Sequence, residues 1–163
     1  MKFTTDFKHT LAINLKKKFG SEYTNVSPEE TFYAKGEYKI CFDIYLESRE
    51  NIVVIELEVK RQDPVHNVIK TIYWLQSVNN NKKVYMIQLF NDDYYKEKKM
   101  ILRKSSEFIG KRVFMLSRRI PYFNYSSISF HYPGGGKNPE RKLKSALDEL
   151  LPRLVKRIRA IGK

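Results

Sequence analysis

Hydrophobic and polar positions alternate most clearly between Asn51 and Gln62, in the run Asn-Ile-Val-Val-Ile-Glu-Leu-Glu-Val-Lys-Arg-Gln. β-branched residues dominate this stretch, which is typical of a strand, and successive side chains of a strand point to opposite faces. One face is apolar throughout: Val53, Ile55, Leu57 and Val59. The other starts apolar and ends polar: Ile52, Val54, Glu56, Glu58 and Lys60. We therefore expect a buried strand that ends at a polar cleft.

A second strand, residues 37–46, precedes this one and contains an aspartate, Asp43, between two apolar residues. Aspartate is depleted in strands, so its presence there needs a reason. The segment 48–51 fits a four-residue hairpin loop, which would make the two strands antiparallel neighbours. Asp43 then faces Glu56, with Glu58 diagonal to it on the same face. A register slip of one residue would move Asp43 to the opposite face, so this prediction depends on the loop.

The rest of the chain alternates between helical and extended patterns, which predicts an α/β fold with a mixed central β-sheet flanked by helices. Asp63 and Pro64 are typical of a helix start, and glycines after two helical patterns are typical of helix ends. Pro152 is expected to kink or divide the last helix. The predicted helices cover residues 5–19, 65–78, 92–109 and 138 onward, and the predicted extended segments cover 31–34, 83–90, 112–116 and 122–132.

The length of 163 residues predicts a single domain, with a core over about 5–116 and a basic extended segment and C-terminal helix over 117–163. No apolar run is long enough to span a membrane, and the first residues lack the pattern of a signal peptide. Cys41 is the only cysteine, which excludes an intrachain disulfide and a zinc site built from several cysteines. These features predict a cytoplasmic protein.

The net charge of +13 is concentrated in the last third of the chain, where residues 101–163 carry 15 Lys or Arg and 4 Asp or Glu. A localised excess of this kind indicates a polyanionic partner, most often nucleic acid. The alternative is a solvated, Lys-rich surface of the type found in thermophile proteins. The candidate phosphate-binding residues there are Arg118, Arg119, Lys137, Arg141 and Lys144. Three polar residues of the second helix, His66, Asn67 and Lys70, either line the cleft or form an ordinary solvent-exposed face.

The strongest candidate site combines Asp43, Glu58 and Lys60. Carboxylates on adjacent strands are the hard oxygen ligands that Mg²⁺ prefers, and such a metal ion activates water for phosphodiester hydrolysis. A lysine two residues after Glu58 lies on the same face and can orient the attacking water or offset negative charge. The alternative is an exposed strand face with cross-strand ion pairs.

Phe42-Asp43, followed by Glu58-Val59-Lys60 at the end of a hydrophobic strand, resembles the PD-(D/E)XK nuclease superfamily. The resemblance covers roughly residues 5–90 and implies a restriction-endonuclease-like core with a C-terminal helical extension. It also implies hydrolysis of DNA with Mg²⁺ or Mn²⁺, and in many cases a homodimer. By this resemblance Asp43 and Glu58 bind the metal ion and Lys60 assists the attacking water.

Two positions depart from the pattern of the superfamily. Phe42 replaces the proline of its name, a substitution that the superfamily tolerates. Many members carry a metal-binding glutamate on the first helix, where this chain offers only Asp6 and His9. Glu56 is either a further metal ligand or a partner of Lys60.

The sequence therefore predicts a divalent-metal-dependent DNA endonuclease in which Asp43, Glu56, Glu58 and Lys60 form the catalytic set. One alternative is a non-catalytic nucleic-acid-binding protein of the same fold, and another is a structural protein with a basic surface. The form of the nucleic acid, whether DNA or RNA, duplex, branched or single-stranded, stays open.

Overall fold

The computed structural model describes residues 2–34, 38–60, 62–77, 81–116, 123–132 and 138–161. In the described part of the chain five strands form one mixed sheet in the order β1-β2-β3-β4-β5. The elements, in chain order, are α1 (Lys2–Phe19), β1 (Asn25–Ala34), β2 (Tyr38–Glu47), β3 (Asn51–Glu58), α2 (Val65–Ser77), β4 (Lys83–Asn91), the 3₁₀ turn η1 (Glu97–Lys99), α3 (Met100–Leu116), β5 (Phe123–Phe130) and α4 (Pro139–Ile161).

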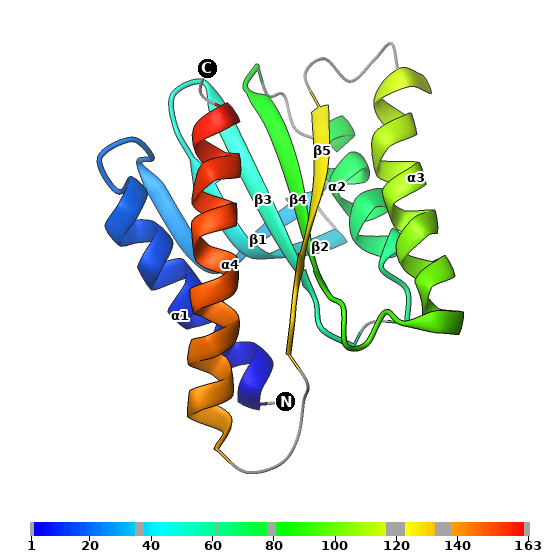
Figure 1. Ribbon diagram of the computed structural model, residues 1–163. Helices are drawn as coiled ribbons and strands as arrows, with labels where there is room; N and C mark the ends of the chain where they lie inside the picture. Colours follow the sequence, from blue (N-terminus) through cyan, green and yellow to red (C-terminus); the bar gives the residue numbers. More distant parts are fainter. Residues whose placement is uncertain are drawn as a thin grey trace.

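The strands combine an antiparallel and a parallel half. β1, β2 and β3 pair as an antiparallel meander, and β4 and β5 each pair parallel to the preceding strand. The parallel half needs helical crossovers, which α2 supplies between β3 and β4 and α3 supplies between β4 and β5. Helices cover both faces: α1 and α4 lie on one side of the sheet, and α2 and α3 lie on the other (Figure 1). The predicted α/β class and mixed, helix-flanked sheet are thus confirmed.

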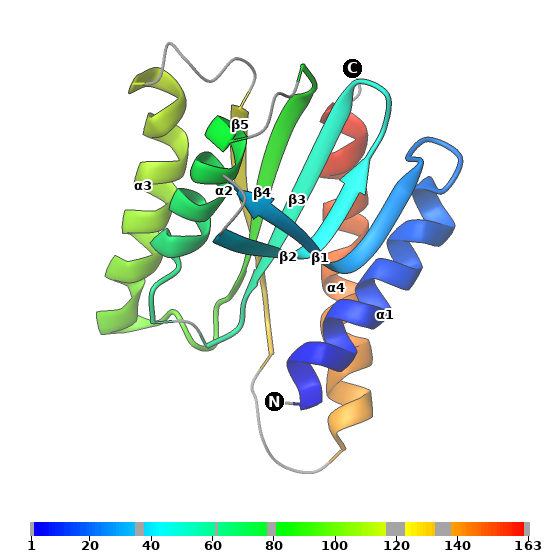
Figure 2. The same cartoon turned by 180° about the vertical axis from the view of Figure 1, so that it is seen from behind.

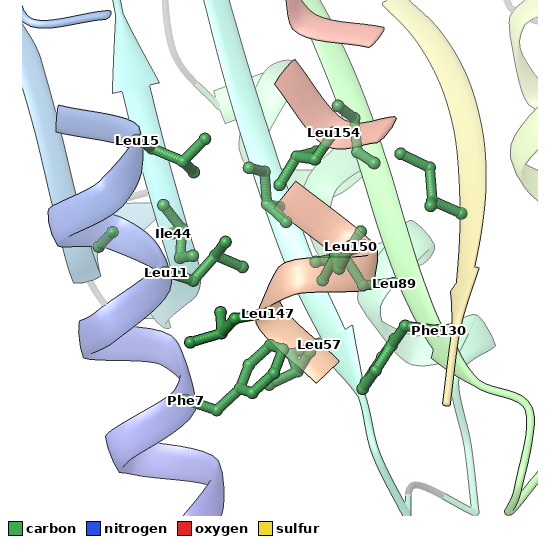
Figure 3. Close-up of a cluster of buried hydrophobic side chains, with 14 of the residues drawn as sticks. Phe7, Leu11, Leu15, Ile44, Leu57, Leu89, Phe130, Leu147, Leu150 and Leu154 are labelled. Carbon is green, nitrogen blue, oxygen red and sulfur yellow. The ribbon is translucent and has the colours of Figure 1, made fainter. Parts of the chain in front are cut away.

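The larger hydrophobic cluster lies between the sheet and the helices α1 and α4 (Figure 3). The predicted apolar face of β3, from Val53 to Val59, packs in this cluster. α1 contributes an apolar stripe with a spacing of four residues: Phe7, Leu11, Leu15 and Phe19. α4 contributes a similar stripe: Leu147, Leu150, Leu154 and Ile158. The C-terminal helix was expected as an extension beyond the core, but it supplies part of the main core.

A second cluster fills the space between the sheet and α2 and contains Ile52, Val54, Val68 and Trp74. The two faces of β3 therefore divide as the alternation of its sequence predicts. Glu56 and Glu58 continue the α2-facing side beyond Val54, at the end of the strand, and both are buried.

The predicted hairpin register is confirmed where β2 and β3 pair, because Ile44 lies opposite Ile55 and Glu47 lies opposite Ile52. The paired ladder ends at Ile44, one residue before Asp43 would lie opposite Glu56. Beyond that point β2 stays paired with β1 but leaves β3, and the two strands turn toward α2 (Figure 2).

The face assignment of β2 changes at this bend. The period-two pattern puts Phe42 and Ile44 on one face, yet Phe42 packs in the α2 cluster and Ile44 in the α1 cluster. In β1, Glu29 occupies the position between the pairs Pro28–Ile44 and Glu30–Phe42 and has a φ of 54°. This left-handed conformation is uncommon outside glycine and coincides with the bend of the two strands.

Two predicted elements in the second half of the chain were wrong. The helix expected over 92–109 begins only at Met100, and its expected end at Gly110 and the strand 112–116 are replaced by one helix, α3, that continues to Leu116. Gly110 is buried against the Tyr125 ring, and a Cβ added there would lie 2.4 Å from a ring carbon. The glycine therefore permits a close approach between helix and strand and does not end the helix.

Three further predictions concern the segments around the core. β1 begins at Asn25 and is longer than the predicted extended segment 31–34. α4 continues through Pro152 as one helix, so the proline does not divide it. Arg118, Arg119 and Lys137 lie outside the described residues.

Among the described helices, none combines the length and apolar character of a membrane span.

Candidate active site

Asp43 lies where β2 separates from β3, and its side chain replaces the missing strand pairing. Its Oδ2 accepts a hydrogen bond from the backbone N–H of Leu57 at 2.8 Å. A buried N–H group on a strand needs an acceptor, and this one would lose its partner where the ladder ends. The bond explains why an aspartate occurs inside a strand pattern, and it fixes the carboxylate beside the end of β3.

Lys8 of α1 holds the other side of the Asp43 carboxylate. Its Nζ lies 3.1 Å from Oδ1 of Asp43 and 2.6 Å from Oε1 of Glu29. Burial lowers the pKa of Lys8, but the hydrogen bond to Glu29 and the charge of Asp43 outweigh that effect and raise the pKa. Lys8 therefore stays charged and links α1 to both strands at their bend.

Glu56 is buried on the α2 side of β3 and pairs with Lys70. The Lys70 Nζ donates to Oε1 of Glu56 at 2.8 Å and to the backbone oxygen of Cys41 at 2.7 Å. Burial, together with the charges of Asp43 and Glu58, raises the pKa of Glu56 to about 8, although Lys70 lowers it. The three carboxylates are thus close enough to influence one another.

Glu58 is fully buried and is oriented by two amide side chains. Asn67 of α2 donates to its Oε1 at 2.8 Å, and Gln88 of β4 donates to the same atom at 2.7 Å. The Gln88 amide also donates to the backbone oxygen of Pro64 at 2.9 Å, which ties the start of the second helix to the sheet. Glu58 therefore has a fixed position set by α2 and β4.

The support of Glu58 extends through Gln88 toward α3 and the edge strand β5, on the same face of the sheet. The Oε1 atom of Gln88 accepts hydrogen bonds of 2.7 Å from the hydroxyls of Ser106 on α3 and Tyr125 on β5. Burial raises the pKa of Tyr125 well above its usual range, so its hydroxyl keeps its proton and donates. α2 and β4 thus hold the buried carboxylate directly, and α3 and β5 support it through Gln88.

The remaining predicted residues lie at different depths. Lys60 follows β3 and is exposed, directly after the buried carboxylates. His66 is exposed in the first turn of α2, where its backbone N–H donates to Asp63 Oδ1 and so confirms Asp63 as the helix cap. Asn67 and Lys70, in contrast, hold Glu58 and Glu56. Arg141 and Lys144 are exposed in the first turns of α4.

Lys8, Gln88 and Tyr125 belong to the site but were not among the predicted site residues. Lys8 looks like one of many helix lysines in the sequence, and Tyr125 like a packing residue of a strand. Gln88 offered the one local signal, because a glutamine stands between apolar residues in a predicted strand, as Asp43 does. A buried polar group in such a position requires a hydrogen-bonding partner.

Asp43 and Glu58 are the side chains that fit a divalent metal ion best. Within the described part of the chain, no group of three or more His, Cys, Asp and Glu side chains has the arrangement of a metal site. Mg²⁺ does not require such a group, because it commonly binds through one or two carboxylates together with water and substrate phosphates. Asp43 is partly accessible, with a side-chain exposure of 23%. Glu58 accepts hydrogen bonds from two amides, and such bonds orient a metal-binding carboxylate.

Comparison with protein-family models, curated proteins and solved structures gave no significant match to this chain.

Proposed function

We propose that this chain is a divalent-metal-dependent DNA endonuclease of the restriction-endonuclease-like fold. The main observation behind this proposal is the position of Asp43. The pairing between β2 and β3 ends next to it, and its side chain bonds to the Leu57 N–H beside Glu56 and Glu58. The order of elements from α1 to β4 supports this proposal, since it contains the helix, strand hairpin, helix and strand that the resemblance covers.

In this proposal Asp43 and Glu58 hold Mg²⁺ or Mn²⁺, which polarises the phosphodiester and lowers the pKa of a bound water. Lys60, exposed directly after the carboxylates, orients the attacking water and offsets negative charge. Asn67 and Gln88 keep the Glu58 carboxylate in place. Glu56, paired with Lys70, supports the arrangement from the buried side.

The test is cleavage of supercoiled plasmid DNA with Mg²⁺, with Mn²⁺ and with EDTA. We expect metal-dependent cutting that falls at least about 100-fold in Asp43→Asn and in Lys60→Met, which is the usual size of a lost electrostatic contact in catalysis. Matched controls carry the same chemical changes at exposed positions away from the site: Asp148→Asn and Lys39→Met. Equal loss in variants and controls would contradict the assignment.

A second candidate function is nucleic-acid binding without cleavage. The observation that favours it is that Lys8 already pairs with the carboxylate of Asp43, one of the two proposed metal ligands. The plasmid assay distinguishes the two functions, because a binding protein shifts the mobility of the plasmid without cutting it, equally in the wild type and in Asp43→Asn.

A further inference from the structure

The β5 edge of the sheet carries three adjoining hollows of about 420, 270 and 390 Å³. The first lies toward α3, and the second and third lie toward the C-terminal half of α4. The first two share Lys83, Tyr85 and Tyr125, and the last two share Arg157. We call this continuous depression the edge trough. Each hollow is about the size that accepts one small ligand.

Five cations belong to the described lining of the edge trough, and one of them, Arg153, is paired with Glu149. The other four are Lys83, Lys111, Lys156 and Arg157, and the described lining contains no Asp or Glu. Within the described residues, none of these four cations forms an ion pair. A hollow lined by one sign of charge concentrates ligands of the opposite sign.

Aromatic rings accompany these cations. Tyr85 of β4 and Tyr125 of β5 line the first two hollows. Tyr125 is buried against Gly110, so the partly buried Tyr85 is the ring available for stacking. A positively charged groove combined with aromatic side chains is the arrangement that binds single-stranded nucleic acid, since phosphates contact the cations and bases stack on the rings.

The edge trough runs along β5, two strands away from β3. Its first hollow includes Lys83, which pairs with Asn51 at the start of β3, about 23 Å along the strand from Glu58 at the usual rise per residue. Its third hollow is lined by Ser127 and Ile128, which are level with Glu56 and Leu57 across β4. This hollow lies toward α4, whereas Glu56 and Glu58 bond to side chains of α2 on the other face of the sheet. The trough and the carboxylates are therefore separate surfaces.

We propose that the edge trough binds a single strand of nucleic acid, at a surface separate from the site of cleavage. The inference rests on the proposed function for the class of ligand, but it does not require the carboxylates. A second copy of this chain fits the same surface poorly, because symmetric pairing of two β5 edges would bring like charges together.

The test is binding of a fluorescein-labelled oligothymidylate of about 15 nucleotides, followed by fluorescence anisotropy in EDTA. EDTA prevents metal-dependent cleavage, so the result is independent of the proposed catalysis. We expect the variant Lys156→Gln with Arg157→Gln to bind about tenfold more weakly at about 50 mM salt. Its slope of log affinity against log salt should fall by about 1.4, because each single-strand phosphate contact contributes about 0.7.

The matched control is Lys17→Gln with Lys18→Gln, which removes the same charge from exposed positions on α1. We expect it to change the affinity less than about twofold, as does Asp43→Asn, since neither touches the trough. Tyr85→Leu keeps apolar bulk but removes a stacking surface, and we expect it to weaken binding about fivefold or more. Thermal unfolding of each variant verifies that it is folded.

Three results would overturn the proposal. The first is no binding by the wild type, and the second is an equal loss in the trough variant and the α1 control. The third is displacement of the oligonucleotide by polyglutamate at equal charge, which would identify a general polyanion surface. Loss of plasmid cleavage with intact oligonucleotide binding would contradict the proposed endonuclease and leave the edge trough supported.

Discussion

Charged side chains at the end of β3 and along the β5 edge are balanced in different ways. At the end of β3, Asp43 and Glu56 each contact a lysine, and buried Glu58 accepts from two amides. In the edge trough, Lys83, Lys156 and Arg157 form no ion pair within the described residues. The carboxylates are largely buried and internally satisfied, whereas these cations are open to solvent.

The difference indicates which charges serve folding and which remain for a ligand. A buried charge is costly unless it is paired, so the partners of Asp43, Glu56 and Glu58 are needed for the folded state. A solvated cation contributes little to stability whether or not it is paired. Substitutions at the carboxylate end should therefore change the stability strongly, and substitutions in the edge trough should change only binding.

The largest expected effect is that of Gln88→Leu, which removes one amide donor from the buried Glu58. We expect a loss of about 3–5 kcal/mol in the free energy of unfolding, because the carboxylate is left inside the protein without this partner. The matched control Gln76→Leu changes an exposed position of α2 and should stay within about 0.5 kcal/mol. Urea unfolding measures both, and a similar small change in the two variants would remove the special role of Gln88.

The pH dependence of stability should follow Glu56. Its pKa is about 8 in the folded protein against 4.5 in the reference state, so the folded state binds more protons between these values. Stability therefore falls as the pH rises through this window, on the order of 3 kcal/mol from this group. In Glu56→Gln, measured in EDTA, the fall between about pH 5 and 9 should be smaller by this amount. Glu22→Gln, at an exposed position, should keep the slope of the wild type.

Gly110→Ala tests the close contact between α3 and β5. Helix propensity alone predicts a gain of about 1 kcal/mol in stability, but the new Cβ would meet the Tyr125 ring. We expect a net loss of about 1–3 kcal/mol from overpacking. The melting temperature measures the outcome, and we expect it to fall. A higher melting temperature would show that the Tyr125 ring moves aside at little cost.

Lys8→Met should have a moderate effect, about 1 kcal/mol of lost stability, because Lys8 is largely buried between two carboxylates. If Asp43 also holds a metal ion, removing this competing charge should strengthen stabilisation by Mg²⁺. Melting temperatures at increasing MgCl₂ concentration measure this shift. Lys16→Met, at an exposed position of the same helix, should not increase it.

The smallest effect on folding is expected for Lys156→Gln with Arg157→Gln. Both side chains are exposed and unpaired within the described residues, so the free energy of unfolding should change by less than about 0.5 kcal/mol. Thermal unfolding in the absence of nucleic acid provides the measurement. A large loss of stability would mean that these cations also stabilise the folded state. It would contradict the contrast between the buried carboxylates and the exposed cations.

Local sequence was sufficient for much of the fold and for part of the site. The alternation in β3 predicted both of its faces, and the short loop before it predicted the pairing of Ile44 with Ile55. Polar residues within apolar strands pointed to Asp43 and Glu58. The helix end at Gly110 could not be predicted correctly, because the reason for that glycine is a tyrosine brought near only by folding.

By itself, the sequence determined most of the strands and helices, though not the segment 112–116, and it determined the two faces of β3 and the carboxylates at its end. These features depend on periodicity and on contacts between neighbours in the chain. Only the tertiary structure decided that Asp43 bonds to Leu57, that Lys8 and Gln88 support the carboxylates, and that the unpaired cations gather along the β5 edge. Those relations join residues far apart in the chain, and their partners are selected by burial in the folded protein.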